Sequence, residues 1–222
     1  MKLSEKELAA LPASKIYFGS RATGYDQGRA GNPVTDEDDA VIQSFISSFQ
    51  PAAIVADAPC GTGRALAAVV GAGHTYRGAD ISSHMLEECR SKVPPGANVD
   101  LQVADARSLP WEDGSCDYLL SIKFLKWLPS DAVVFEVLKE YRRVCHGRAL
   151  INVKIAKEKP EISLREMRDR IAKLVDRIML GSAARSIRRD AFEGMCRNAG
   201  WKIESAQVNK ASNGIVYNFI LS

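Results

Sequence analysis

The sequence predicts an α/β protein with a doubly wound, mostly parallel sheet that has helices on both faces. Short apolar runs, typical of buried parallel strands, alternate with longer segments of helical periodicity. The first run, residues 54–56, leads through Asp57 into a tight turn with Gly61 and Gly63, and a helix-forming segment follows. A strand, a glycine turn and a helix in this order form the first half of a βαβ unit. A chain of 222 residues is long enough for one well-buried core.

Polar side chains lie where four of the predicted strands end. They are Asp57, Asp80, Asp105 and Ser121. Because parallel strands end at the same edge of a sheet, these side chains are expected to meet at one ligand site. Asp80 follows the glycine turn at a distance that suits an acid bound to the hydroxyls of a ribose.

The glycine turn does not match the dinucleotide fingerprint. Its third glycine would fall at position 66, which is Leu66, and a Gly-X-Gly core alone is a weak signal. Asp57 precedes the turn, where its charge would repel a pyrophosphate and attract a cation. These features favour a cofactor that carries an ammonium and a sulfonium group over NAD.

With these motifs, the chain resembles the class I S-adenosylmethionine (SAM)-dependent methyltransferases, specifically the small bacterial single-domain type. The resemblance runs from about residue 17 to residue 222 and rests on residues 57–63, 80–86, 105–106 and 121 onward. Pro59 stands where the family usually has glycine, in an Asp-X-Pro-Cys-Gly-Thr-Gly variant of the first motif. The resemblance implies a Rossmann-like, seven-stranded sheet with an antiparallel last strand. It also implies one domain over residues 1–222, with an N-terminal cap segment (1–50) and a helical insert (156–186).

The resemblance also implies the residues that bind SAM. Asp57 and the glycine backbone would hold the methionine moiety, Asp80 the ribose hydroxyls, and Asp105 the adenine amino group. The full set of expected cofactor-binding residues is Asp57, Ala58, Pro59, Cys60, Gly61, Gly63, Asp80, Ile81, Ser82, Met85, Asp105, Ala106, Ser121 and Ile122.

Residues for the acceptor and for proton transfer are less well defined. The N-terminal segment would contact the acceptor, or would only cover the edge of the core, through Tyr17, Arg21 and Tyr25. Two lysines, Lys123 and Lys126, follow the fourth strand at the mouth of the site. Each lysine would contact an anion, act as a base if burial lowered its pKa, or have no role. The remaining base candidate is His84, which alternatively packs near Asp80; His74 and His146 precede strands and so lie at the wrong end of the sheet. No metal site is expected.

The helical insert is the distinctive segment of the chain. Residues 163–180 combine a capping box, Ser163 to Glu166, with one apolar face. Eleven Lys and Arg outnumber six Asp and Glu between Lys154 and Asp190. The helix is interpreted as an acceptor lid, or as an element that only packs or forms a homodimer or partner interface.

Composition limits the class of protein. A hydrophobic content of 46%, a charged content of 26% and a net charge of +3 are typical of a soluble globular protein, and they do not indicate nucleic acid. Five scattered cysteines, without a membrane span or a secretory segment, favour reduced thiols in the cytoplasm. The expected acceptor is a small, anionic or lipid- or sugar-linked molecule, as in lipopolysaccharide or small-molecule modification. The alternatives are an RNA methyltransferase and a non-catalytic SAM-binding partner or regulator.

The spacing of apolar residues, together with the prolines and glycines that interrupt it, predicts further helices and strands. Helices are expected from Thr35 to before Pro51, over 64–70, from Ser82 or Ser83 to Arg90, and over 131–143 and 190–199. Later strands are expected over 149–154, from about residue 200, and over 216–221.

Overall fold

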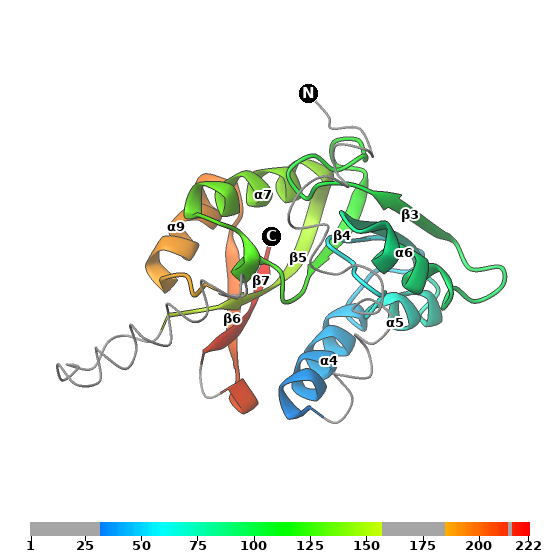
Figure 1. Ribbon diagram of the computed structural model, residues 1–222, viewed down its shortest axis with the longest axis horizontal. Coiled ribbons are helices and arrows are strands. Elements are labelled where there is room, and N and C mark those ends of the chain that lie inside the picture. Colours follow the sequence, from blue (N-terminus) through cyan, green and yellow to red (C-terminus); the bar gives the residue numbers. More distant parts are fainter. Residues whose placement is uncertain (1–31, 157–184, 213–214) are drawn as a thin grey trace.

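The computed structural model describes residues 32–156, 185–212 and 215–222 (Figure 1). Seven strands form one sheet in the order β3-β2-β1-β4-β5-β7-β6. The strands are β1 (Ile54–Asp57), β2 (Thr75–Asp80), β3 (Val99–Val103), β4 (Cys116–Ser121), β5 (Cys145–Lys154), β6 (Ile203–Asn209) and β7 (Val216–Leu221). The helices are α4 (Pro33–Ile46), α5 (Leu66–Gly71), α6 (Ser83–Arg90), α7 (Asp131–Val144) and α9 (Arg189–Asn198), with short 3-10 turns η2 (Leu125–Trp127) and η3 (Lys210–Ser212).

The sheet has the predicted doubly wound topology. Strands β1 to β5 are parallel, and β7 runs antiparallel to both β5 and β6, which confirms the antiparallel last strand. The order of the strands reverses between β1 and β4, because the chain first builds outward to β3 and then returns to the other side of β1. In open α/β sheets the crevice at this reversal, outside the carboxyl ends of the strands, is where ligands bind.

Two apolar layers, one on each face of the sheet, make up the core. Helices α7 and α9 cover one face, and α4, α5 and α6 lie on the other (Figure 1). Neighbouring strand residues face opposite layers: Leu119 packs with α7, and Leu120 packs with the layer under α4 and α5. Buried strands covered on both faces account for the near-continuous apolar runs in the sequence.

Helix α4 begins earlier than expected. Asn32 is its N-cap and accepts a hydrogen bond from the Val34 backbone at 3.0 Å, and Pro33 occupies the first helical position. The predicted start at Thr35 was wrong because an Asn-Pro pair already supplies both a capping oxygen and a suitable φ. Helix α6 was predicted correctly: the Ser82 side chain accepts from the Met85 backbone at its N-terminus.

Two other boundaries differ from the expectation. Helix α5 begins at Leu66, because the preceding residues complete the glycine turn. Strand β5 begins at Cys145, whereas residue 149 was expected, because Cys145 already pairs with Cys116 of β4. Gly147 permits this pairing, since a Cβ there would lie 2.1 Å from the Asp117 carbonyl oxygen. Within the described residues no helix is long and apolar enough to cross a membrane.

Candidate active site

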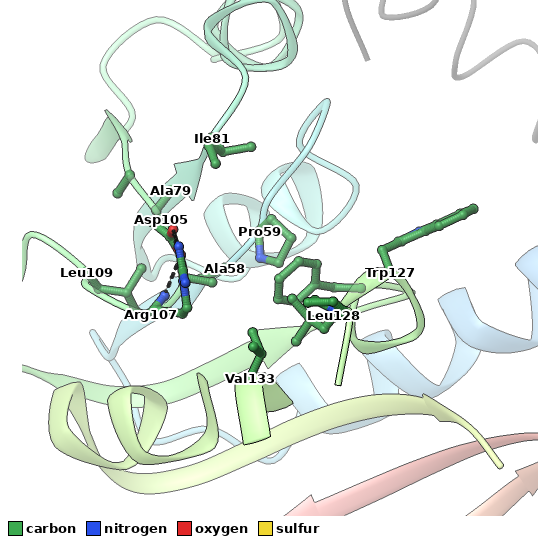
Figure 2. Close-up of a pocket in the computed structure, with 14 residues that line it drawn as sticks. Ala58, Pro59, Ala79, Ile81, Asp105, Arg107, Leu109, Trp127, Leu128 and Val133 are labelled. Carbon is green, nitrogen blue, oxygen red and sulfur yellow. Dashed lines mark hydrogen bonds and ion pairs between the residues drawn. The ribbon is translucent and has the colours of Figure 1, made fainter. Parts of the chain in front are cut away.

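A cavity of about 440 Å³ opens at the carboxyl edge of the sheet, beside the point where the strand order reverses. Figure 2 shows that its lining side chains come from the ends of β1 and β2, the loop after β3, and the segment that follows β4. Its lining residues are Ala58, Pro59, Ala79, Ile81, Ala104, Asp105, Ala106, Arg107, Leu109, Phe124, Trp127, Leu128, Pro129 and Val133.

The glycine turn after β1 lets a ligand approach the backbone closely. Gly61 and Gly63 have φ angles of +55° and +79°, a region that favours glycine. A Cβ on Gly63 would lie 2.6 Å from the Cys89 sulfur, so a larger residue would also displace α6. The Cys60 backbone donates to the Ala79 carbonyl at 2.9 Å and joins the turn to β2. The Cys60 thiol is buried, and its hydrogen bond with Cys89 and its burial raise its pKa, so this side chain packs.

Asp80 connects the turn to the end of β2. Its carboxylate accepts hydrogen bonds from the backbones of Gly61 and Ser82, each at 2.9 Å. Burial nevertheless raises the pKa of Asp80 to about 6, although its backbone hydrogen bonds oppose the shift. The carboxylate is therefore poorly solvated, and additional donors such as a pair of ribose hydroxyls would stabilise its charge.

Asp57 is more deeply buried, at 3% exposure. Its carboxylate accepts a hydrogen bond from the Tyr76 hydroxyl at 2.7 Å. Burial raises the pKa of Asp57 to about 7, the Tyr76 hydrogen bond lowers it, and the charge of Asp80 raises it further. Two buried acids at the same edge would, when ionised, favour a cation over a pyrophosphate.

Asp105 lines the cavity with a partner that the sequence analysis did not identify. The Arg107 backbone donates to its carboxylate at 2.9 Å, and the guanidinium group donates to both of its oxygens at 2.6–3.1 Å. Figure 2 shows this pair at the cavity wall. An aspartate whose carboxylate binds the backbone two residues on is a local turn motif, so the spacing of Asp105 and Arg107 was an available signal.

Ser121 lies at the expected strand end, but its side chain does not line the cavity. The hydroxyl is fully buried and lies 3.0 Å from the Tyr141 hydroxyl of α7. Tyr141 in turn donates to the Ala58 carbonyl, just before the glycine turn. These contacts link β4, α7 and β1, so Ser121 supports the site through packing. Ile122 likewise packs against the core layer under α4.

The other wall of the cavity is apolar. Leu128 and Val133 point into the cavity from the end of η2 and the start of α7, and the Trp127 ring lies at its edge (Figure 2). Phe124, just before η2, also lines it. Trp127 is 38% exposed and lines the cavity at the surface. The other three were missed, because an apolar residue after a strand predicts burial without showing what it faces.

The two predicted lysines differ in their surroundings. Lys123 has a φ of +59°, and its ammonium lies 3.2 Å from the buried Asp38 carboxylate and 3.1 Å from the Thr35 hydroxyl of α4. Lys126 is half-buried, its ammonium lies 5.1 Å from the centre of the Trp127 ring, and burial lowers its pKa. Lys123 therefore ties α4 to the loop after β4, whereas Lys126 lies beside the cavity.

The remaining expected residues are near the turn or outside the described part of the chain. Met85 is buried, and its terminal methyl lies 3.3 Å from where a Gly61 Cβ would be. His84 lies in the first turn of α6 and is not among the residues that line the cavity. Tyr17, Arg21, Tyr25 and the 163–180 helix lie outside the described residues.

The site fits a nucleoside cofactor with a cationic tail. The glycine turn lets a ligand approach the backbone closely, burial raises the pKa values of two acids beside it, and an apolar cavity is lined by Asp105 and Ile81. Ala58, Pro59, Ile81, Asp105 and Ala106, all predicted from the sequence, line this cavity directly.

Sequence comparison places this site in a known type of domain. Residues 55–147 match the family described as "Methyltransferase domain". The demethylmenaquinone methyltransferase of Staphylococcus aureus (strain MRSA252) is 40% identical over 91 residues. This match covers 40% of the chain and 36% of the relative, so the chain spans about a third of that relative's length.

Solved structures share the fold. A magnesium protoporphyrin IX methyltransferase from Synechocystis PCC 6803, solved with bound S-adenosylhomocysteine (SAH), has a TM-score of 0.69 at 15% identity. The superposition covers 93% of this chain and 96% of that chain. A SAM-dependent methyltransferase from Aquifex aeolicus has a TM-score of 0.62 at 15% identity, over 90% of this chain and 97% of that one. At these sequence identities, the structural similarity shows a shared fold alone.

Residues 55–147 thus match a methyltransferase domain, and the seven-stranded sheet that contains them has the fold of solved methyltransferases. The solved neighbours with this fold include a methyltransferase crystallised with bound SAH and with bound SAM.

Proposed function

We propose that this protein transfers a methyl group from SAM to a small, flat and largely apolar acceptor. The observation that carries the proposal is the junction of two surfaces at one edge of the sheet. Asp80, bonded to the Gly61 backbone at 2.9 Å, lies at one side, and an apolar cavity wall with Phe124 and Trp127 lies at the other. Two similar proteins, named as methyltransferases of demethylmenaquinone and of magnesium protoporphyrin IX, support a flat acceptor.

The chain's own residues would bind, orient and exclude water. When bound, SAM supplies an activated methyl group on a sulfonium, so the protein mainly has to align donor and acceptor. Asp80 would accept from the ribose hydroxyls, Asp105 with Arg107 would face the adenine amino group, and Asp57 would favour the cationic methionine end. Phe124 and Leu128 would keep the reacting carbon in a dry environment.

The carboxyl edge of the sheet has two halves, and the ends of β1, β2 and β3 form the cofactor half. The carboxyl ends of β4 and β5 together with η2 are called the acceptor half. The division follows the strand order, because β1 and β4 are neighbours at the point of reversal.

The test is a transfer assay with methyl-labelled SAM. The purified protein would be incubated with demethylmenaquinone, with magnesium protoporphyrin IX and with a fractionated cell extract, and labelled products would be identified by mass spectrometry. We expect label in a small apolar product, strongly reduced by Asp80→Ala and unchanged by Asp100→Ala. Asp100 is a matched control because it lies on the edge strand β3 and its side chain accepts a hydrogen bond from Gln102. Label found in RNA, or no transfer although SAH binds, would contradict the proposal.

A further inference from the structure

Three lysines gather at the acceptor half. Lys123 and Lys126 follow β4, and Lys154 ends β5, the strand paired with β4. Lys123 and Lys154 are close enough for their charges to lower the pKa of Lys126, in addition to the larger effect of burial. Three ammonium groups near one another repel, and the buried Asp38 carboxylate, whose charge raises the pKa of Lys126, is the negative charge among the described residues that offsets this repulsion.

Only one of the three lysines has a carboxylate at ion-pair distance within residues 32–156, 185–212 and 215–222. Lys123 pairs with Asp38. Lys126 and Lys154 have no carboxylate at that distance among these residues, and both are half-buried. The neighbouring cation Arg185 is paired with Asp131, so it does not add an unpaired charge.

The backbone around these two lysines is fixed. The Arg185 backbone donates to the Lys126 carbonyl, and the Ile187 backbone donates to the Lys154 carbonyl, each at 2.9 Å. One short segment thus ties both lysines to the same edge of the sheet. The Lys126 ammonium lies against the Trp127 ring, which itself lines the cavity.

We infer that Lys126 and Lys154 form an anion-binding subsite that holds an oxyanion, a carboxylate or a phosphate, of the acceptor. The acceptor then combines a flat apolar body, which packs against Trp127 and Phe124, with a negative group at its end. The inference rests on the proposed methyl transfer, and it assigns Lys123 a structural role in place of the substrate contact predicted from the sequence. An oxyanion between the two ammonium groups would relieve their repulsion and form charge-assisted hydrogen bonds.

The test measures anion preference directly, with probes of matched shape. Isothermal titration on the protein saturated with SAH would compare 2-naphthoate and 2-naphthyl phosphate with the neutral 2-naphthamide. We expect at least one anion to bind about tenfold more tightly than the amide, and the tighter one identifies the oxyanion. Lys126→Ala and Lys154→Ala should each remove most of that preference, while the affinity for the amide stays the same.

Two controls keep the result specific. Lys202→Ala removes an exposed lysine at the start of β6 and should keep the full anion preference. Lys126→Arg retains a cation and should restore most of it. Equal affinity for anions and amide, no binding of any naphthyl probe, or an unchanged preference in the Lys126→Ala/Lys154→Ala double variant would overturn the subsite. A separate titration of SAH into the free protein tests the cofactor side of the proposed function, because failure of the subsite leaves that heat unchanged.

Discussion

At the cofactor half, carboxylates lie against backbone N–H groups, whereas the acceptor half presents apolar rings and lysines. Asp80 receives its hydrogen bonds from Gly61 and Ser82, in the turns that follow β1 and β2. Phe124 and Trp127 of the other half depend on packing between η2 and the start of α7. The cofactor half is therefore defined by local backbone geometry, and the acceptor half by contacts between distant segments.

This difference has a consequence for specificity. A carboxylate fixed by backbone donors recognises one ligand geometry, and many side-chain changes elsewhere leave it intact. An apolar wall with two lysines can be altered one side chain at a time, so acceptor choice can change while the cofactor stays the same. Variants in the two halves should then affect different ligands.

The largest effect is expected for Asp80→Ala. Loss of a charge-assisted contact with two hydroxyls should cost roughly 2–3 kcal/mol and raise the dissociation constant for SAH about thirty- to a hundredfold. Isothermal titration measures this, and circular dichroism verifies the fold. Asp100→Ala serves as the control. An unchanged affinity in Asp80→Ala would remove this residue from the cofactor half.

A smaller effect, on stability alone, is expected for Lys123→Ala. Asp38 is 1% exposed and accepts from Asn152 and Asn209, and it would lose its nearest cation. Urea unfolding should show a loss of about 1–2 kcal/mol, whereas Lys126→Ala should change stability little. If both variants unfolded alike, the distinction between a structural and a binding lysine would be wrong.

The buried acids of the cofactor half predict a dependence on pH. Burial raises the pKa of Asp57 to about 7 and of Asp80 to about 6, well above the ordinary value of 3.8 for an aspartate. Because the folded state binds these protons more tightly, their contribution to stability is full below about pH 4 and is lost as the pH rises through about 7. A cationic cofactor binds the charged form of these acids, so its affinity should weaken at low pH, where their contribution to stability is greatest. We expect the affinity to fall about tenfold between pH 7.5 and 5.5.

The readout is the SAM dissociation constant as a function of pH. Tyr76→Phe offers a matched variant, since the Tyr76 hydrogen bond lowers the pKa of Asp57. Its removal should move the loss of affinity to higher pH. A flat affinity from pH 5.5 to 8 in the wild-type protein would show that neither acid acts on the cofactor in its charged form.

The smallest of these effects is expected for Arg107→Ala. The guanidinium fixes the orientation of the Asp105 carboxylate at the cavity wall, so its loss should raise the SAH dissociation constant about fivefold. Asp105→Ala should cost at least as much, and the double variant should cost no more than Asp105→Ala. Additive losses would show that Arg107 contacts the cofactor independently of Asp105.

Much of the fold and of the cofactor half was predictable from the sequence. The positions of strand-end acids such as Asp57 and Asp80 can be predicted from the neighbouring sequence, because each follows a buried apolar run and adjoins a turn. The strand ends and the cap of α6 at Ser82 were predicted for the same reason. Boundaries failed where two local signals competed, as at Asn32 and Pro33.

The acceptor half was not predictable in the same way. Lys123 and Thr35 are 88 positions apart, and Tyr141 and Ala58 are 83 apart, so neither contact leaves a local pattern. Lys154 appeared only as the end of a strand, and its proximity to Lys126 follows from the pairing of β4 with β5. Such groupings depend on tertiary packing, which a single sequence does not specify residue by residue.

The most direct test of the central claim is titration of the wild-type protein with SAH and, separately, with NAD. A cofactor half with Asp57 and Asp80 at the glycine turn predicts clear heat with SAH, one site per chain, and none with NAD. Heat with NAD and none with SAH or SAM would contradict the assignment of the site.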